Sequence, residues 1–494
     1  MNDAPRTCDL AVIGAGSAGF SASITAADQG AQVVLIGSGT IGGTCVNIGC
    51  VPSKTLIRAA ETLHNARVTA RFAGITAKAK LTDWRRTVQQ KDELVSALRQ
   101  ARYIDLLSAY NGITYREGLA RLVEGGVEVD GTSIPAAKII IATGARPAVP
   151  AIPGIETVPY LTSTTALDLQ ELPRSLLVIG GGYVGAELAQ MFARAGVEVT
   201  LVCRSRLLPQ AEPEIGAALQ RYFEEEGITV VSGIAYRAIR KTEGDVSLTL
   251  TRDGQDVSID AEQVLITTGR SPNVQGLGLD DHSIAVSPKG AIIVDDYMRT
   301  TKAGVYAAGD VTGRDQFVYM AAFGAKLAAL NALNGDSLRY DNAAMPWVVF
   351  TDPQVAGVGL GEVGAGLPDR GLVRIDAVHV GVRVTAGDRE RGAPLAAGHV
   401  GHTRRRVLAL QRPVHLRHRR EPFAGEQVVE QDAAEPGLAL VQVVPVVGIR
   451  HAVAGAEGVD HRVDGAGAGD EQLGHRRHEL EAGLLHQHRS VTRR

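Results

Sequence analysis

The sequence of 494 residues has little that would connect it to a membrane or to nucleic acid. Its apolar runs, such as residues 10–13 and 139–142, fit buried strands and are far shorter than the roughly 20 residues of a membrane span. The formal net charge is only −3, so no basic excess favours nucleic acid. The N-terminus lacks a basic segment followed by a signal-type apolar stretch. We therefore expect a cytoplasmic protein that binds neither partner.

Cysteine is also scarce, because the whole chain has four. Two of them, Cys45 and Cys50, lie in the run GGTCVNIGCVPSK at residues 42–54, with glycines before them and helix-forming sequence after them. A helix N-terminus favours thiolate over thiol, so this pair can carry two electrons as a dithiol/disulfide couple or bind a soft metal ion. The alternative is that both are buried packing residues. Cys8 and Cys203 lie in strand patterns, and we expect them to pack in the core.

Two segments have the order strand, glycine-rich turn, helix and strand that binds a dinucleotide. The first runs from a strand at residues 7–13 through GAGSAG at 14–19 to a strand at 32–36. The second spans residues 175–202, with GGGYVG at 180–185. In such a turn the glycines let the backbone approach a pyrophosphate at the helix N-terminus. The expected fold class is therefore α/β, with two Rossmann-like dinucleotide-binding domains.

The residues after the second strand of each unit bear on which nucleotide is bound. An acid usually stands there to bind ribose hydroxyls, but the first unit has Gly37, which predicts weaker or different adenosine binding. The second unit has Arg204 and Arg206, which suit the 2′-phosphate of NADPH, unless they are ordinary surface charges. Near the end of the run VYAAGD stands Asp310, which can hold a flavin hydroxyl or simply end a strand. Together these features imply an electron relay from a nicotinamide through a flavin to the cysteine pair.

These motifs resemble the flavin-dependent pyridine nucleotide-disulfide oxidoreductases, which include glutathione reductase, dihydrolipoyl dehydrogenase and mercuric reductase. The similarity runs from about residue 7 to residue 360. Within the family, the mercuric reductases are most similar at GTIGG (39–43), QFVY (316–319) and AMPWVVFTDPQ (344–354). The resemblance implies FAD and NADPH as cofactors and the reduction of Hg(II) to Hg(0). A dihydrolipoyl dehydrogenase-like disulfide oxidoreductase is the alternative.

The resemblance also implies roles for individual residues. Cys50 would lie beside the flavin as a thiolate, Cys45 would be the outer thiol that meets the substrate, and the two would bind Hg(II). Lys54 would lie near the flavin ring, paired with Glu187. The other residues that the resemblance places at FAD are Gly14, Gly16, Gly19, Gly39, Thr44, Gly118, Ala120, Thr143, Gly144, Asp310 and Val318. Those that it places at the nicotinamide nucleotide are Gly180, Gly182, Gly185, Arg204 and Gly269.

The same resemblance divides the chain into domains. It predicts an FAD-binding domain from residues 1–150 and 275–340, interrupted by a NAD(P)-binding domain at 151–274. The start of a dimerisation domain is expected at 341–360. In the family that domain forms the homodimer, and in mercuric reductases its C-terminal region brings a tyrosine and a cysteine pair to the partner's active site. No cysteine follows Cys203 in this chain.

Residues 361–494 differ in composition from the rest. They contain 19 arginines, 11 of the 13 histidines and no lysine. A GC-rich gene read in the wrong frame gives this composition, so we interpret the segment as a frameshifted tail in which the dimerisation domain is disrupted. A metal-binding histidine-rich stretch and a solvated basic tail are the alternatives. Dimerisation is therefore doubtful, and a truncated, inactive flavoprotein is a further alternative.

Overall fold

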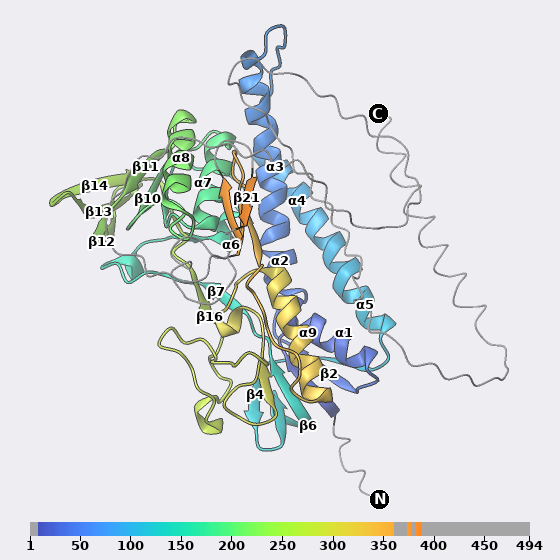
Figure 1. The fold of residues 1–494 in the computed structure, drawn as a ribbon. Helices are drawn as coiled ribbons and strands as arrows, with labels where there is room; N and C mark the ends of the chain where they lie inside the picture. Colours follow the sequence, from blue (N-terminus) through green and yellow to red (C-terminus); the bar gives the residue numbers. More distant parts are fainter. Residues whose placement is uncertain (1–7, 360–372, 378–381, 387–494) are drawn as a thin grey trace, which may run out of the picture. The chain divides into compact units, whose positions relative to one another are not determined.

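The computed structural model describes residues 8–359 and the two strands at 373–377 and 382–386, all within one compact unit of the chain (Figure 1). The first of its larger sheets has the strand order β3-β2-β1-β6-β5-β4, with β17 paired to β6. The strands are β1 (Cys8–Ile13), β2 (Val33–Gly37), β3 (Ile113–Glu117), β4 (Ala120–Val123), β5 (Gly126–Val129), β6 (Thr132–Ile141) and β17 (Val305–Ala307). β1 lies between β2 and β6 and runs parallel to both.

Two helices rich in small residues pack beside this sheet. They are α1 (Ser17–Asp28) and α9 (Val318–Asn334), which lie against each other although about 300 residues separate them in sequence (Figure 1). Ala22 and Ala26 of α1 and Ala325 and Ala328 of α9 are buried in one core. Small side chains allow the two backbones to approach closely, and the Ser21 hydroxyl donates a hydrogen bond to a carbonyl of α9 at 2.7 Å.

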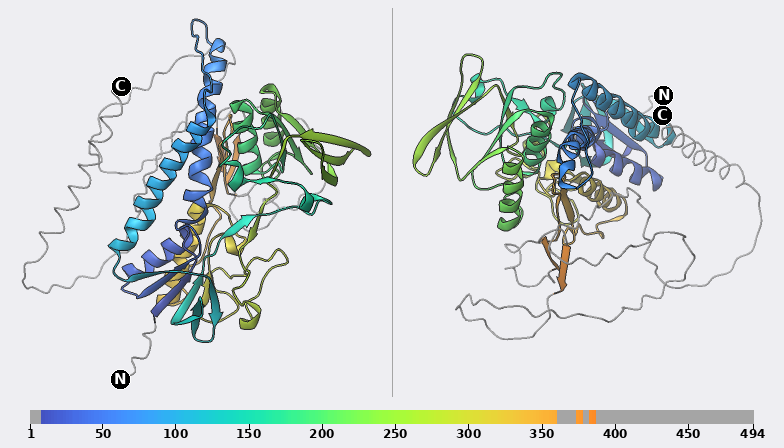
Figure 2. Two further views of the ribbon diagram at one scale, coloured as in Figure 1. Left: turned by 180° about the vertical axis from the view of Figure 1, so that it is seen from behind. Right: turned by 90° about the horizontal axis from the view of Figure 1, so that it is seen from above.

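The cysteine motif folds into two consecutive helices at the start of a long helical hairpin. Its helices are α2 (Gly43–Asn47), α3 (Cys50–Arg67), α4 (Trp84–Arg99) and α5 (Asp105–Ala109), with a π-helical turn at Gln100–Ile104. Asp83 caps α4 by accepting the backbone N–H of Arg86. α3 and α4 lie side by side, as the view from behind in Figure 2 also shows. Cys45 therefore lies in α2, and Cys50 begins α3.

The second large sheet repeats the design of the first. Its order is β11-β10-β9-β15-β8, and its strands pair in parallel. The strands are β8 (Leu161–Thr162), β9 (Ser175–Ile179), β10 (Glu198–Cys203), β11 (Thr229–Ser232) and β15 (Gln263–Ile266). The helices of this part are α6 (Ser163–Ala166), α7 (Tyr183–Ala195) and α8 (Pro213–Glu225). An antiparallel sheet is added by β12 (Ala235–Lys241), β13 (Val246–Arg252) and β14 (Gln255–Ala261).

Three antiparallel pairs complete the described structure. β7 (Ala145–Pro147) pairs with β16 (Arg270–Pro272), where the chain crosses between the two large sheets. β18 (Pro346–Val349) and β19 (Val355–Val358) form a hairpin in the segment predicted to begin the dimerisation domain. β20 (Val373–Ala377) pairs with β21 (Val382–Ala386). Apart from β20 and β21, the predicted frameshifted tail lies outside the described residues. Short 3₁₀ turns occupy Val68–Arg71, Ile155–Thr157, Asp280–His282 and Asp310–Thr312.

The predicted α/β class is confirmed. In each of the two large, mainly parallel sheets, one strand leads through a glycine-rich turn into a helix. The first sheet takes strands from both ends of the described chain, and the second takes strands from residues 161–266. The exact domain bounds stay a prediction. Cys8 and Cys203 are buried in strands, as expected. In the part of the chain that the structure describes, none of the helices has the length and apolarity that a membrane crossing requires.

Candidate active site

A cavity of about 520 Å³ lies at the carboxyl ends of β1, β2 and β6. Parallel α/β sheets bind ligands at this edge, where neighbouring strands lead to opposite sides of the sheet. Most of the residues that the sequence placed at FAD or the redox centre line it. They are Gly14, Gly16, Gly39, Thr44, Cys45, Cys50, Lys54, Gly118, Ala120, Thr143, Gly144, Glu187, Asp310 and Val318.

The first glycine-rich turn holds the β1–α1 connection against β6. Gly14 has a φ of +119°, and a Cβ there would collide with the carbonyl oxygen of Ala142. Gly19 does not line the cavity; it lets α1 pack on the carbonyl of Gly14, which is the third glycine's role in such turns. No side chain caps the N-terminus of α1, and its first turn carries no acid. Its free N–H groups therefore suit a pyrophosphate, so the turn fits FAD.

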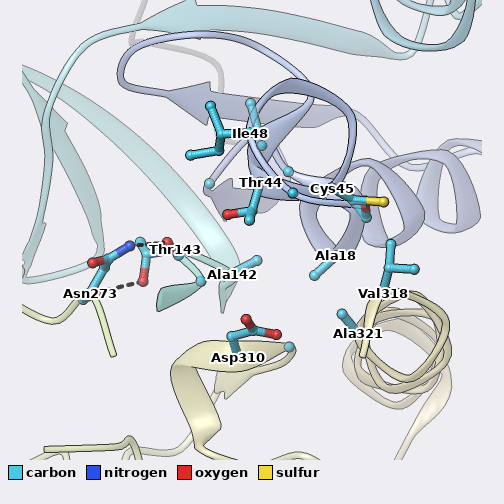
Figure 3. Close-up of a pocket in the computed structure, with 18 of the residues that line it drawn as sticks. Ala18, Thr44, Cys45, Ile48, Ala142, Thr143, Asn273, Asp310, Val318 and Ala321 are labelled. Atoms are coloured by element: carbon cyan, nitrogen blue, oxygen red, sulfur yellow. Dashed lines mark hydrogen bonds between the residues drawn. The ribbon is translucent and has the colours of Figure 1, made fainter. Parts of the chain in front are cut away.

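Polar groups enter the cavity from several distant segments (Figure 3). Thr44 comes from α2, and Asp310 faces the cavity from the turn that follows β17. Arg270 Nε lies 3.4 Å from Asp310 Oδ2. Burial raises the pKa of the Asp310 carboxyl, and the nearby charge of Arg270 opposes this shift in part. Asn273 donates to the Thr143 carbonyl at 3.0 Å, and its own carbonyl accepts the Thr143 hydroxyl at 2.6 Å. These contacts hold the residues that would bind the polar parts of FAD.

Sequence reasoning missed Arg270 and Asn273. Arg270 begins the crossing strand β16 and Asn273 follows it, and the pairing of β16 with β7 brings both to the cavity. Arg270 also donates to the carbonyl oxygen of Ala145. The local signal for both residues is the run ITTGRSPN at 266–273, which is similar to the family but by itself gives these side chains no role.

The two cysteines of the motif are free thiols that both line the cavity. Cys45 is half-buried and Cys50 is exposed. The pKa of Cys50 is lowered to about 7, because the Cys45 thiol donates a hydrogen bond to it and the Lys54 ammonium favours the thiolate. The pKa of Cys45 is raised by this same hydrogen bond and by burial. The pair therefore loses its first proton at Cys50.

Alkylation of the reduced protein should reveal this asymmetry. We expect the reaction of Cys50 with iodoacetamide to rise with an apparent pKa of about 7 and to fall at lower pH as the thiolate is protonated. Cys45→Ala removes the hydrogen-bond donor and should raise that pKa, whereas Cys45→Ser retains a donor and should raise it less. Peptide mapping of the alkylated cysteine at each pH measures the curve. Equal reaction of both cysteines at neutral pH would contradict it.

Lys54 and Glu187 form the ion pair that the resemblance implied. Lys54 Nζ lies 2.5 Å from Glu187 Oε2, and the Glu187 side chain is only 8% exposed. The other carboxylate oxygen accepts the backbone N–H of Phe350 at 2.9 Å. The Lys54 ammonium lies 5.1 Å from the centre of the Phe350 ring. Phe350, the residue after β18, thus fixes the ion pair between Lys54 of α3 and Glu187 of α7. The sequence predicted the ion pair but not this contact with Phe350.

The second glycine-rich turn repeats the geometry of the first. Gly180 has a φ of +120°, and its Cβ would lie 2.6 Å from the carbonyl oxygen of Thr267. Gly185 lets α7 pack on the carbonyl of Gly180. The N-terminus of α7 again lacks a side-chain cap and a first-turn acid. None of the residues predicted to bind the nicotinamide nucleotide lines the cavity described above. These residues are Gly180, Gly182, Gly185, Arg204 and Gly269.

Comparison with known proteins gives the family. The family model described as "Pyridine nucleotide-disulphide oxidoreductase" matches residues 8–325. A curated mercuric reductase from Streptomyces lividans is 46% identical over 360 residues, which cover 72% of this chain and 76% of the relative. One from Staphylococcus aureus is 43% identical over 72% of this chain. The match spans 65% of that relative, less than two thirds of its length.

The solved structures agree with this assignment. The HOCl-induced flavoprotein disulfide reductase RclA from Escherichia coli has 32% sequence identity and a TM-score of 0.64, over 75% of this chain and 82% of RclA. The structure of a Cu(II) complex of RclA has 31% sequence identity and a TM-score of 0.65, over 73% of this chain and 79% of RclA. FAD and NADPH are the cofactors of these families. The chain therefore belongs to the pyridine nucleotide-disulphide oxidoreductases, as an FAD-dependent oxidoreductase whose curated relatives include mercuric reductases.

Proposed function

We propose that this protein reduces Hg(II) to Hg(0) with NADPH through FAD and the Cys45–Cys50 pair. The observation that carries the proposal is the pair of free thiols, one with a lowered pKa, in the lining of the cavity. Thiolates are ligands that soft metal ions prefer, and a thiolate pair supplies two of them. In the part of the chain that the structure describes, no cluster of three or more histidine, cysteine or acidic side chains offers another metal site.

Each side chain has a separate task in this proposal. FAD, when bound, passes the two electrons of NADPH to the sulfur pair. Cys50 holds a thiolate at neutral pH, and Cys45 receives Hg(II) as the second sulfur ligand. Lys54 stabilises the thiolate electrostatically, and Glu187 fixes the position of the Lys54 ammonium. Hg(II) held by the two thiolates takes up two further electrons, which a second NADPH would supply through bound FAD, and leaves as neutral mercury.

The functional test compares two substrates on purified protein with FAD bound. We expect Hg(II), added with excess thiol, to stimulate NADPH oxidation, and lipoamide to give little. Activity with lipoamide but not with Hg(II) would favour the disulfide oxidoreductase alternative. No NADPH oxidation with either would favour the inactive flavoprotein. The fold similarity to a flavoprotein disulfide reductase is the reason to retain lipoamide in the comparison.

Arg204 is the residue that we propose recognises the 2′-phosphate of NADPH. It is exposed after β10, and the described residues offer its guanidinium no hydrogen bond or ion pair. Arg206, by contrast, donates to the carbonyl oxygens of Pro209 and Ala211 at 3.0 and 2.8 Å. One arginine is thus available for a ligand, and the other holds its own loop.

Arg204→Ala should raise the KM for NADPH about tenfold and leave that for NADH unchanged, because one charge-assisted contact to the 2′-phosphate is lost. Steady-state kinetics with both nucleotides measure the effect. Arg206→Ala serves as the control, since loss of the loop contacts should affect both nucleotides alike. An equal rise for NADPH and NADH in Arg204→Ala would sink the assignment.

The division into domains belongs to the same proposal. Sheet membership supports an FAD-binding domain from residues 1–150 and 275–340 and a NAD(P)-binding domain at 151–274. We also propose a cytoplasmic location, where NADPH is available as the reductant.

Resequencing the gene across codons 350–370 tests the frameshift interpretation. Another frame that encodes a continued dimerisation domain would restore the family homodimer.

A further inference from the structure

The end of β2 departs from the usual ribose-binding design. Dinucleotide-binding units commonly place an acid there for the ribose hydroxyls. This chain has Gly37, which lines the cavity beside Ser38 and Gly39. Without an acid at position 37, the adenosine ribose of FAD needs a hydrogen-bond partner from another part of the chain.

Packing explains why no acid stands at this position. A Cβ on Gly37 would lie 2.7 Å from Ala15 Cβ and 2.8 Å from the Tyr115 hydroxyl oxygen, both too close for a real side chain. Tyr115 belongs to β3 and pairs in register with Leu35. Alternate residues of a strand share a face, so its ring reaches along β2 from Leu35 toward Gly37. The Tyr115 hydroxyl therefore occupies the space that an acid at the end of β2 would need.

This hydroxyl lies beside Ala15 and Gly37, two residues of the cavity lining, although Tyr115 is not itself a lining residue. Tyr115 is half-buried, and within residues 8–359 its hydroxyl has no hydrogen-bond partner. Burial, and then the charge of Glu117, raise its pKa, so it stays neutral and can both donate and accept a hydrogen bond. Glu117, in register with Gly37, is exposed, and none of its atoms is among the three nearest to a Cβ on Gly37. Tyr115 is the closer polar group, because its hydroxyl is among the nearest atoms to a Cβ on Gly37.

We propose that the Tyr115 hydroxyl binds the adenosine ribose hydroxyls of FAD in place of the missing acid. A neutral hydroxyl from the middle of β3 takes over what a carboxylate at the end of β2 commonly does. The inference rests on FAD as the cofactor of this cavity and is independent of the Hg(II) substrate. A protein that fails to reduce Hg(II) can still confirm it.

FAD titration of the apoprotein tests this role without any turnover. Tyr115→Phe removes only the hydroxyl, and we expect the Kd for FAD, followed by flavin fluorescence, to rise about five- to tenfold. The Kd for FMN, which lacks the adenosine, should not change. Tyr110→Phe is the matched control, because Tyr110 is not among the nearest neighbours of Gly37 and its loss of a hydroxyl should leave both values unchanged.

An FAD analogue that lacks the adenosine 2′-hydroxyl makes the test specific. The wild-type protein should bind this analogue more weakly than FAD, and Tyr115→Phe should reduce or remove the difference. The wild-type half of this comparison stands even if the variant folds poorly. Equal binding of FAD by wild-type and Tyr115→Phe protein would overturn the proposal. A loss in Glu117→Gln with none in Tyr115→Phe would assign the ribose to Glu117 instead.

Discussion

Replacing either cysteine of the motif with serine should reduce Hg(II)-dependent NADPH oxidation by about a thousandfold or more. A serine hydroxyl cannot join the remaining sulfur in a disulfide, and it is a poor ligand for a soft metal ion. Cys50→Ser also removes the thiolate that forms at about pH 7, and Cys45→Ser removes the thiol that donates a hydrogen bond to it. Both variants therefore lose the same two-electron unit by different routes.

Two measurements separate this loss from misfolding. NADPH should still bleach the flavin absorbance of Cys45→Ser in the absence of Hg(II), because the nucleotide site of the second sheet is untouched. Cys8→Ala should retain activity, since Cys8 is buried at the start of β1 and does not line the cavity. If Cys45→Ser kept a tenth of the wild-type rate, the sulfur pair would not be the redox centre of the Hg(II) reaction.

The parts of the site that the sequence predicted are those built by local backbone geometry. Gly14 and Gly180 each stand in a turn whose conformation depends on a few neighbouring residues, so a short motif reveals them. Cys45 and Cys50 are separated by one break between two helices and are equally local. The predicted α/β class follows from the same motifs, because each requires a strand before it and a helix after it.

The parts that the sequence did not predict depend on contacts between distant segments. The Phe350 N–H that binds Glu187 is a backbone donor, which has no sequence signature. The packing of Tyr115 against Gly37 needs the β2–β3 register, which no motif encodes. The spacing of Gln190 and Arg194 from Glu187, at three and seven residues along α7, does carry a signal. Three buried polar residues on one face of a helix indicate a polar partner, although not which one.

That partner is the turn of the β18–β19 hairpin, and its contacts make Arg194 a residue whose loss should cost several kcal/mol of stability. Arg194 is 5% exposed. It donates to Glu226 at 2.6 and 2.7 Å and to Asp352 at 2.9 Å. Gln190 lies beside it and exchanges two hydrogen bonds with the backbone of Asp352, each 2.8 Å long. One side of α7 thus anchors the chain just after Phe350, whose N–H binds Glu187.

Arg194→Met should destabilise the protein by about 3–5 kcal/mol, because it leaves the Glu226 carboxylate, only 15% exposed, and the half-exposed Asp352 without their shared cation. Chemical denaturation at fixed FAD concentration measures the loss. Arg174→Met is the matched control: Arg174 is 71% exposed and pairs with Asp245 at 3.2 Å, so its loss should cost less than about 1 kcal/mol. Equal costs for the two variants would show that the Arg194 cluster adds nothing beyond a surface ion pair.

The pH dependence of the same variant gives a sharper test. His64 Nδ1 lies 3.6 Å from Glu226 Oε2, and its pKa is lowered first by burial and then by the charge of Arg194. A lowered pKa means that the wild-type fold loses stability as the pH falls below the ordinary histidine value. Arg194→Met removes one cause of that loss and lets a protonated His64 pair with Glu226. The stability gap between the two proteins should therefore narrow as the pH falls from 8 toward 6, and a gap that widened would mean that Arg194 does not act on His64.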